Sequence, residues 1–343
     1  MVQKVIIAID PKLDNFACLG NRLHVPVGDN TYDVIIHNDP KVNQNKGGPK
    51  INFDVYIDGV YDRKFNWADF IPPENIRQRK RYPKDVQTIK LARFYEDDLR
   101  QVPDSKETRF INIPSWFVGW NNKNYPTGAG RVVVKSLDGA RGVGQFTVDT
   151  SRVNLNYFCA ELNRLLDGEL TPGCVERLLE PFKECVVYGR GGENYENEGL
   201  EAMKNQGYFV QSLIANVANE YRVLTNGLGV PEYFQRRTVR DKDSKFPQAT
   251  GGGALIDAGA ILDADKFYIE SGVDRDYFER LCEQLIGPIS SIDIFSTRDA
   301  GWGIFEYCNQ FGISGVPDQT AFDLHLGYIK ILIAEMKLNG QLE

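Results

Sequence analysis

The stretch Val132–Asp149 reads VVVKSLDGARGVGQFTVD, with a glycine-rich loop between two apolar runs. The pattern predicts a strand at Arg131–Lys135, a loop at Ser136–Gly144 and a second strand at Gln145–Asp149. Glycines in such a loop let backbone N–H groups approach a phosphate, because they carry no side chain and tolerate positive φ. The loop residues that we expect at a phosphate are Gly139, Arg141, Gly142 and Gly144.

Lys135 ends the first strand, where its ammonium group can place a positive charge against a phosphate. The order of residues is neither that of a Walker A loop nor GxGxxG ahead of a helix. Taken alone, the glycines fit a plain hairpin turn equally well. The interpretation therefore depends on the motifs around and after the loop.

Two enzyme classes share features with this stretch. KSLDGAR resembles the KxDG motif of covalent nucleotidyltransferases such as DNA and RNA ligases, whose lysine attacks the α-phosphate and carries AMP. Here the spacing from Lys135 to Asp138 is one residue longer than in that motif, which in a strand turns a side chain to the opposite face. The longer string KSLDGARGVGQFTV resembles the KPLDGxGGxGIF stretch of bacterial glutathione synthetase, an ATP-grasp enzyme, and the equivalent loop of RimK-type ligases.

The ATP-grasp resemblance continues downstream in the order that the family shows. Tyr208–Ile214, YFVQSLI, resembles the hinge whose backbone binds adenine. The hinge residues that this resemblance implies are Gln211, Ser212 and Leu213. Glu220-Tyr221-Arg222 then resembles the family's D/E-x-R motif, which implies a nucleotide contact for Glu220 and a catalytic arginine at Arg222.

A second arginine position follows in Val230–Arg237, VPEYFQRR, where Arg236 and Arg237 are both candidates for the catalytic residue. Neighbours in a strand face opposite ways, so the sequence leaves open which of the two faces the phosphates. The family next has an Asn-containing loop that ends in two glycines. Pro247–Gly253, PQATGGG, resembles this loop but has Gln248 near the place of the asparagine.

The last motifs of the family are an aspartate on one strand and ExN on the next, which hold Mg²⁺. Asp293 in SSIDIF and Glu306 in GIFEYCNQ fit the two carboxylates. Asn309 lies one residue later than ExN requires, and Cys308 takes its place. We favour a β-bulge that brings Asn309 to the metal, because an amide oxygen suits magnesium and a thiol does not.

The resemblance implies an α/β (α+β) protein with the ATP-grasp fold, in which two α+β lobes grip ATP behind an N-terminal α/β pre-ATP-grasp lobe. We expect the N-terminal lobe at residues 1–110 and the ATP-grasp domain at 111–343. Within that domain the small ATP-binding lobe would cover 131–210 and the metal-binding lobe 211–343. Residues 1–110 cannot be aligned with glutathione synthetase, so glutathione synthesis itself is not supported.

The activity that the resemblance implies is ATP-dependent carboxylate–amine ligation through an acyl phosphate, with ATP and Mg²⁺ as cofactors. The carboxylate and the amine are not identified, and a homo-oligomer stays open. Two alternatives remain. One is a non-catalytic ATP-binding protein on the same fold, and the other is a nucleotidyltransferase that uses Lys135.

Composition narrows the class of protein further. The chain has 343 residues, 42% hydrophobic and 25% charged, and a formal net charge of −7. An acidic chain gains little from counterion release, which disfavours nucleic-acid binding. Six widely spaced cysteines and three scattered histidines indicate reduced thiols in a cytoplasm and no His/Cys metal cage. No apolar run approaches the length of a membrane span. The basic stretch Arg77–Lys84, RQRKRYPK, is either a solvated face or a site for an anionic substrate.

The periodicity of apolar residues predicts the remaining elements. We expect an amphipathic helix at Lys84–Arg100, a strand-like run at Val175–Tyr188 and an acidic, glycine-rich loop at Gly189–Gly199 that closes over ATP. Pro103–Gly130 is predicted to be an irregular connection. The other predicted strands are Lys4–Ile9, Tyr32–His37, Ile51–Val60, Tyr208–Ile214, Asn219–Leu224, Val230–Val239, Ile289–Phe295 and Gly303–Tyr307. The other predicted helices are Asn154–Leu166, Asp274–Ile286 and Ala321–Lys337.

Overall fold

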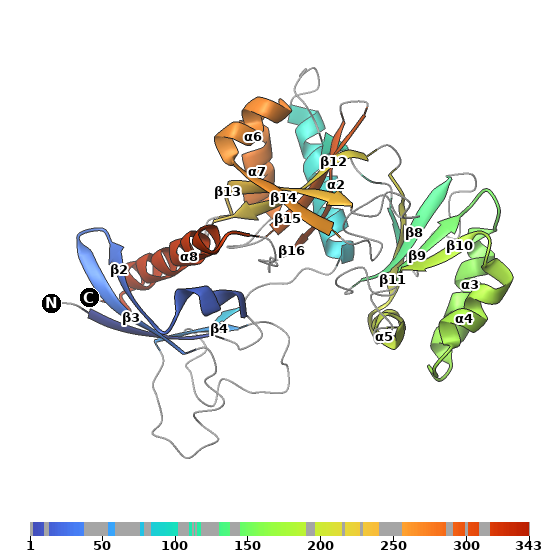
Figure 1. Cartoon of the computed structure of the whole chain (residues 1–343), viewed down its shortest axis with the longest axis horizontal. Coiled ribbons are helices and arrows are strands. Elements are labelled where there is room, and N and C mark those ends of the chain that lie inside the picture. Colours follow the sequence, from blue (N-terminus) through green and yellow to red (C-terminus); the bar gives the residue numbers. More distant parts are fainter. Residues whose placement is uncertain are drawn as a thin grey trace, which may run out of the picture.

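The computed structural model describes most of the chain: residues 3–9, 14–37, 54–58, 76–78, 84–101, 110–111, 113, 115–117, 130–137, 145–189, 196–214, 217–226, 229–239, 256–285, 291–298, 301–308 and 316–342. Within these residues the strands form three sheets, which we call the N-terminal, small and large sheets. Figure 1 shows helices against each of them. The mixed α/β class expected from the sequence is confirmed.

The N-terminal sheet has the strand order β2-β3-β1-β4-β5, in which β2 is antiparallel to β3 and the other pairs are parallel. Its elements are β1 (Gln3–Ile9), η1 (Asp14–Leu19), β2 (Arg22–Val27), β3 (Asn30–His37), β4 (Val55–Asp58) and β5 (Ile76–Gln78). Strand β1 is apolar along most of its length because it lies in the middle of the sheet and is covered there.

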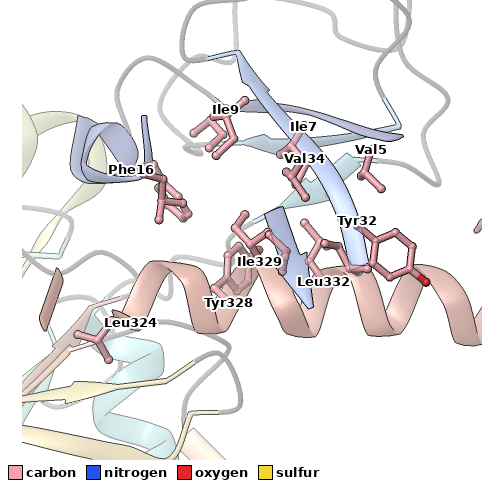
Figure 2. Packing of buried hydrophobic residues seen from close by; sticks show 14 of the residues in the cluster. Val5, Ile7, Ile9, Phe16, Tyr32, Val34, Leu324, Tyr328, Ile329 and Leu332 are labelled. Carbon is pink, nitrogen blue, oxygen red and sulfur yellow. The ribbon is translucent and has the colours of Figure 1, made fainter. Parts of the chain in front are cut away.

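Helix α8 (Asp318–Leu338), at the other end of the sequence, completes the core of this sheet. In Figure 2 the side chains of Tyr328, Ile329 and Leu332 on α8 point toward Ile7 and Val34 of the strands. The N- and C-terminal ends of the chain therefore meet on one lobe, as Figure 1 also shows.

The small sheet has the strand order β10-β9-β8-β11-β7, and all of its pairs are antiparallel. Its elements are β7 (Ser115–Phe117), β8 (Arg131–Ser136), β9 (Gln145–Asp149), α3 (Leu155–Asp167), α4 (Cys174–Leu179), η4 (Glu180–Phe182), β10 (Val186–Gly189), α5 (Glu196–Gln206) and β11 (Tyr208–Ser212). Helix α3 begins where Asn154 Oδ1 accepts hydrogen bonds from two backbone N–H groups. Its buried residues recur at helical spacing and pack on one face of the sheet.

The large sheet has the strand order β14-β13-β12-β15-β16-β6. Its elements are β6 (Phe110–Ile111), β12 (Val217–Thr225), β13 (Pro231–Val239), β14 (Ile256–Asp263), α6 (Ala264–Ser271), α7 (Arg275–Leu285), β15 (Ser291–Thr297) and β16 (Trp302–Cys308). Helices α6, α7 and α2 (Lys84–Gln101) cover one face, where their aromatic side chains join the core of the sheet. Helix α2 thus belongs to this lobe by its contacts.

Three sequence predictions need correction. The strand-like run at Val175–Tyr188 is wrong for its first part, because α4 and η4 occupy residues 174–182 and only the end forms β10. Short apolar runs suit strands and buried helices alike, so periodicity could not separate them. The stretch Gly189–Gly199 ends in helix, since α5 begins at Glu196. The connection Pro103–Gly130 also contains the short strands β6 and β7.

The sequence analysis also missed six further elements: η1, β2, β5, β14, α5 and α6. The other predicted strands and helices are present, with ends that differ by a few residues. Among the described residues, no helix combines the length and the hydropathy needed to cross a bilayer.

Candidate functional site

The face of the large sheet that points away from α6 and α7 carries a row of charged residues. Val223, Phe234 and Ile292 pack toward the helices, so their neighbours along each strand point to the opposite face. The strand pairing places these neighbours beside one another, with Glu220 opposite Arg237 and Asp293 opposite both Arg222 and Glu306. We call this row the polar strip; its members are Glu220, Arg222, Arg237, Asp293 and Glu306.

Asp293 is the buried centre of the polar strip. Arg222 donates two hydrogen bonds to its carboxylate, each 2.9 Å long, and Arg237 Nη1 lies 3.6 Å from the same group. The Asp293 side chain is 2% exposed. Burial by itself raises the pKa of a carboxyl group, but the charges of the two arginines outweigh this effect and lower the pKa of Asp293. The aspartate is therefore ionised and held by two cations.

The structure distinguishes the two candidate arginines of β13. Arg237 points into the site, where burial lowers its pKa against the opposing effect of Asp293. Arg236 is exposed on the other face and donates a hydrogen bond to Asn219 Oδ1 at 2.8 Å. Only Arg237 of this pair joins the polar strip.

The matching face of the small sheet presents Lys135. Its ammonium group donates a hydrogen bond to Gln211 Oε1 at 2.8 Å, and Gln211 Nε2 lies 3.2 Å from Ser115 Oγ as donor. This chain of contacts joins β8, β11 and β7 across the sheet. The expected hinge residue Gln211 is therefore beside Lys135, whereas the Leu213 backbone N–H donates to Arg131 O at 2.9 Å and extends the β8–β11 ladder.

A pocket lies where the two sheets and helix α2 meet. Lys135, Phe209 and Gln211 line it from the small sheet, and Ile304, Phe305 and Glu306 from the large sheet. Helix α2 and the segment before β7 supply the remaining lining residues, Lys84, Gln87, Thr88, Leu91, Tyr95 and Ile113. Ser212 and Leu213 are not among the residues that line it. The pocket thus joins the lysine of the first motif with the glutamate of the last.

Lys84 is a site residue that the sequence analysis did not select. Its Nζ atom lies 3.6 Å from Glu306 Oε2, and its side chain is 12% exposed. It is the last residue of the basic stretch Arg77–Lys84, for which an anion site was one of two interpretations. That stretch was the available signal, but only the packing of α2 against β16 places one of its lysines in the pocket.

Several predicted site residues lie outside the described part of the chain. These are Gly139, Arg141, Gly142, Gly144 and Asn309, together with Gln248 and the glycines after it. The strands that flank the glycine loop do form the predicted hairpin, since β8 pairs with β9 in antiparallel register. Strand β16 pairs with β15 in regular register from Glu306 to Cys308. The register between the two strands shifts at Phe305, which precedes Glu306. The bulge expected next to Asn309 is thus not found within the described length of β16.

The two carboxylates expected to bind Mg²⁺ fit that ion in their chemistry. Asp293 and Glu306 are paired across β15 and β16, and Mg²⁺ prefers carboxylate oxygens together with phosphate oxygens. The oxygens that accept from Arg222 keep a further lone pair each. Within the described residues, no group of three or more His, Cys, Asp or Glu could hold a metal. Two carboxylates would leave coordination positions of the ion for phosphate oxygens.

The charge state of Lys135 gives the site a pH dependence. Burial, and then the nearby charge of Lys84, lower the pKa of Lys135 to about 8. A phosphate bound beside Lys135 would raise this pKa, because it would stabilise the ammonium form, and the protonated protein would then bind that phosphate more tightly. The affinity for an ATP analogue should be constant below pH 7, where Lys135 is protonated, and it should fall as the pH rises through 8. Calorimetric titrations between pH 7 and 9.5 measure it.

The Lys135→Arg variant is the control, because a guanidinium keeps its charge throughout this range. Its affinity should stay level above pH 8. A wild-type affinity that does not change between pH 7 and 9.5 would show that Lys135 does not contact the phosphates.

The two lobes of the chain meet at the pocket. A small antiparallel sheet with helices on its outer face stands against a larger, mainly antiparallel sheet with its own helices, and the pocket lies between them. This arrangement agrees with the ATP-grasp fold that the sequence resemblance implied.

No protein-family model matches the chain, and no curated protein matches its sequence. Solved structures are similar over nearly the whole chain. D-alanine–D-alanine ligase from Bacillus anthracis complexed with ATP shares 10% identity, with 99% of both chains covered and a TM-score of 0.46. D-alanyl-alanine synthetase A from Vibrio cholerae shares 11%, with 99% of both chains covered and a TM-score of 0.47. The RimK domain protein ATP-grasp from Sphaerobacter thermophilus shares 12%, with 95% of this chain and 98% of that chain covered and a TM-score of 0.39. These similarities are too distant to indicate a substrate.

Proposed function

We propose that this chain is an ATP-dependent carboxylate–amine ligase that forms an amide or peptide bond through an acyl phosphate. The observation that carries the proposal is the pocket that brings Lys135, Lys84 and Glu306 together from three elements. Beside it, Arg222 and Arg237 surround Asp293. Four cations and opposed carboxylates between two lobes suit a triphosphate with its metal ion.

The cations have distinct tasks in this proposal. Lys84 and Lys135 neutralise the phosphates of ATP. Arg222 and Arg237 stabilise the γ-phosphoryl group while an oxygen of the substrate carboxylate attacks its phosphorus and ADP leaves. The amine then attacks the acyl carbon and inorganic phosphate leaves. In such chemistry the protein orients the reactants and offsets charge, and it needs no covalent intermediate of its own.

Asp293 and Glu306 would hold Mg²⁺ against the phosphate oxygens. When bound, the ion neutralises phosphate charge and makes the γ-phosphorus more electrophilic. Glu306 is the more accessible of the two carboxylates, at 25% side-chain exposure against 2% for Asp293. We therefore assign the closer approach to the ion to Glu306. In the absence of nucleotide, Lys84 balances the charge of Glu306.

Trapping with hydroxylamine tests the proposed reaction without knowledge of the natural amine. Hydroxylamine attacks an acyl phosphate and gives a hydroxamate, so a panel of amino acids, dipeptides and other small carboxylic acids can be screened with ATP and Mg²⁺. We expect ADP and hydroxamate in equal amounts, both dependent on one class of carboxylate. The Glu306→Gln variant should form neither above background.

One outcome of this assay and one outcome of a labelling control would each favour an alternative function. Nucleotide binding without ADP formation from any carboxylate would favour a non-catalytic ATP-binding protein. Incubation with α-labelled ATP would leave covalent AMP on Lys135 in a nucleotidyltransferase, and we expect no label. The hydrogen bond of Lys135 to Gln211 suits an electrostatic role for this lysine.

A further inference from the structure

The first turn of helix α2 contacts both lobes next to the pocket. The backbone N–H of Lys84 donates to Leu137 O at 3.0 Å, directly before the glycine loop of the small sheet. The Lys84 ammonium group lies 3.6 Å from Glu306 on the large sheet. One turn later, Gln87 Oε1 accepts a hydrogen bond of 3.1 Å from the backbone N–H of Tyr307. Figure 1 shows α2 beside the end of the large sheet that carries β15 and β16.

The side-chain oxygen of Gln87 accepts a backbone hydrogen bond from β16, as a carbonyl oxygen of a neighbouring strand would. One edge of β16 pairs with β15 along its whole length, whereas on the other edge β6 pairs with Trp302 and Gly303 at its start. The N–H of Tyr307 lies beyond that short pairing and is bound by Gln87 instead. Gln87 is 8% exposed, so this contact is shielded from water and costs more to lose than an exposed one.

The contact matters because of its place along β16. The register between β15 and β16 shifts at Phe305, immediately before Glu306, and such a bulge interrupts the regular ladder. The direction of the Glu306 side chain therefore depends on what fixes the chain after the bulge, where β15 pairs with one edge of β16 and Gln87 binds the other. The peptide group between Glu306 and Tyr307 is the one whose N–H Gln87 binds. Its plane sets how Glu306 points toward Asp293 across the ladder.

We propose that Gln87 is a positioning residue of the metal site: its buried amide oxygen fixes the peptide group after Glu306 and thereby aims the Glu306 carboxylate. The inference rests on the proposed function, because it takes Glu306 as the ligand of Mg²⁺. Groups that orient a metal ligand in this way alter metal affinity by about 10- to 100-fold when they are removed. A purely structural role would change stability and leave metal affinity unchanged.

Paramagnetic resonance with Mn²⁺, which prefers the same oxygen ligands as Mg²⁺, tests the inference on the full chain. Free Mn²⁺ is titrated in the presence of a non-hydrolysable ATP analogue. At a concentration of the analogue that saturates each variant, Gln87→Leu should weaken Mn²⁺ binding about tenfold. Glu96→Gln, at an exposed position of the same helix, should leave Mn²⁺ binding unchanged.

The variants separate this inference from the proposed function. If the wild type binds no nucleotide, or if Glu306→Gln binds Mn²⁺ as the wild type does, the proposed function is wrong. If Glu306→Gln weakens Mn²⁺ binding but Gln87→Leu does not, the positioning role of Gln87 is wrong. If Gln87→Leu does not fold, Gln87→Asn replaces it, since its shorter side chain withdraws the oxygen from Tyr307; wild-type Mn²⁺ affinity in that variant would equally overturn the inference.

Discussion

Replacing Asp293 by asparagine should lower the free energy of unfolding by about 3–5 kcal/mol. The substitution keeps the shape of the side chain but removes the charge that Arg222 and Arg237 share at 2.9 and 3.6 Å. Both guanidinium groups would then remain near each other in a buried place without their anion. The loss of one partner from a buried ion pair has this large cost because the remaining charge is desolvated and uncompensated.

Urea unfolding of Asp293→Asn and the wild type, without nucleotide or metal, gives the value. The ion pair between Arg152 and Glu184 is the matched control, since it is as short, at 2.7 Å, but exposed. Glu184→Gln should change the stability by less than about 1 kcal/mol. If Asp293→Asn lost as little as Glu184→Gln, the buried ion pair would not be the centre of the polar strip.

Replacing Lys135 by methionine should weaken the binding of an ATP analogue by about 10- to 150-fold. The substitution keeps most of the length of the side chain and removes its charge. A hydrogen bond to a charged group contributes about 1.5–3 kcal/mol, which corresponds to this range of dissociation constants. Lys183→Met is the control, because Lys183 is an exposed lysine of the small lobe that pairs with Glu180 away from the pocket. It should bind the analogue as the wild type does.

The stability of the Lys135→Met variant should be equal to that of the wild type or higher. Burial makes the charged form of Lys135 unfavourable in the folded protein, which is why its pKa falls to about 8. A weakened affinity together with a lowered stability would point to a damaged fold instead of a lost phosphate contact. Thermal unfolding of the variant without nucleotide distinguishes the two.

The motifs were sufficient to predict most strands of the small and large sheets, because each motif lies within one segment of the chain. The strands around the glycine loop, the strand with Arg222 and the strand with Asp293 each show an apolar run bounded by polar or turn residues, which is a signal within one segment. The prediction of a strand-like run at Val175–Tyr188 was wrong because it too used a signal from one short segment. Its buried residues Cys174, Val175 and Leu178 lie on a short helix, and six residues are too few for a period to decide.

The site was less predictable because it depends on contacts between distant segments. The choice between Arg236 and Arg237 follows from the register of β12 and β13, which no single strand reveals. The contact of Lys84 with Glu306 joins residues far apart in sequence, through the packing of α2 on β16. Gln87 gives no signal at all in the sequence, because its hydrogen bond is made to a backbone group.

A calorimetric titration of the full chain with a non-hydrolysable ATP analogue and Mg²⁺ tests the central claim, that ATP binds between the small and large sheets. We predict one analogue per chain, displacement by ATP, and the same stoichiometry with strongly reduced affinity in Lys135→Met. Absence of binding by the wild type, or equal affinity in the wild type and Lys135→Met, would contradict the claim.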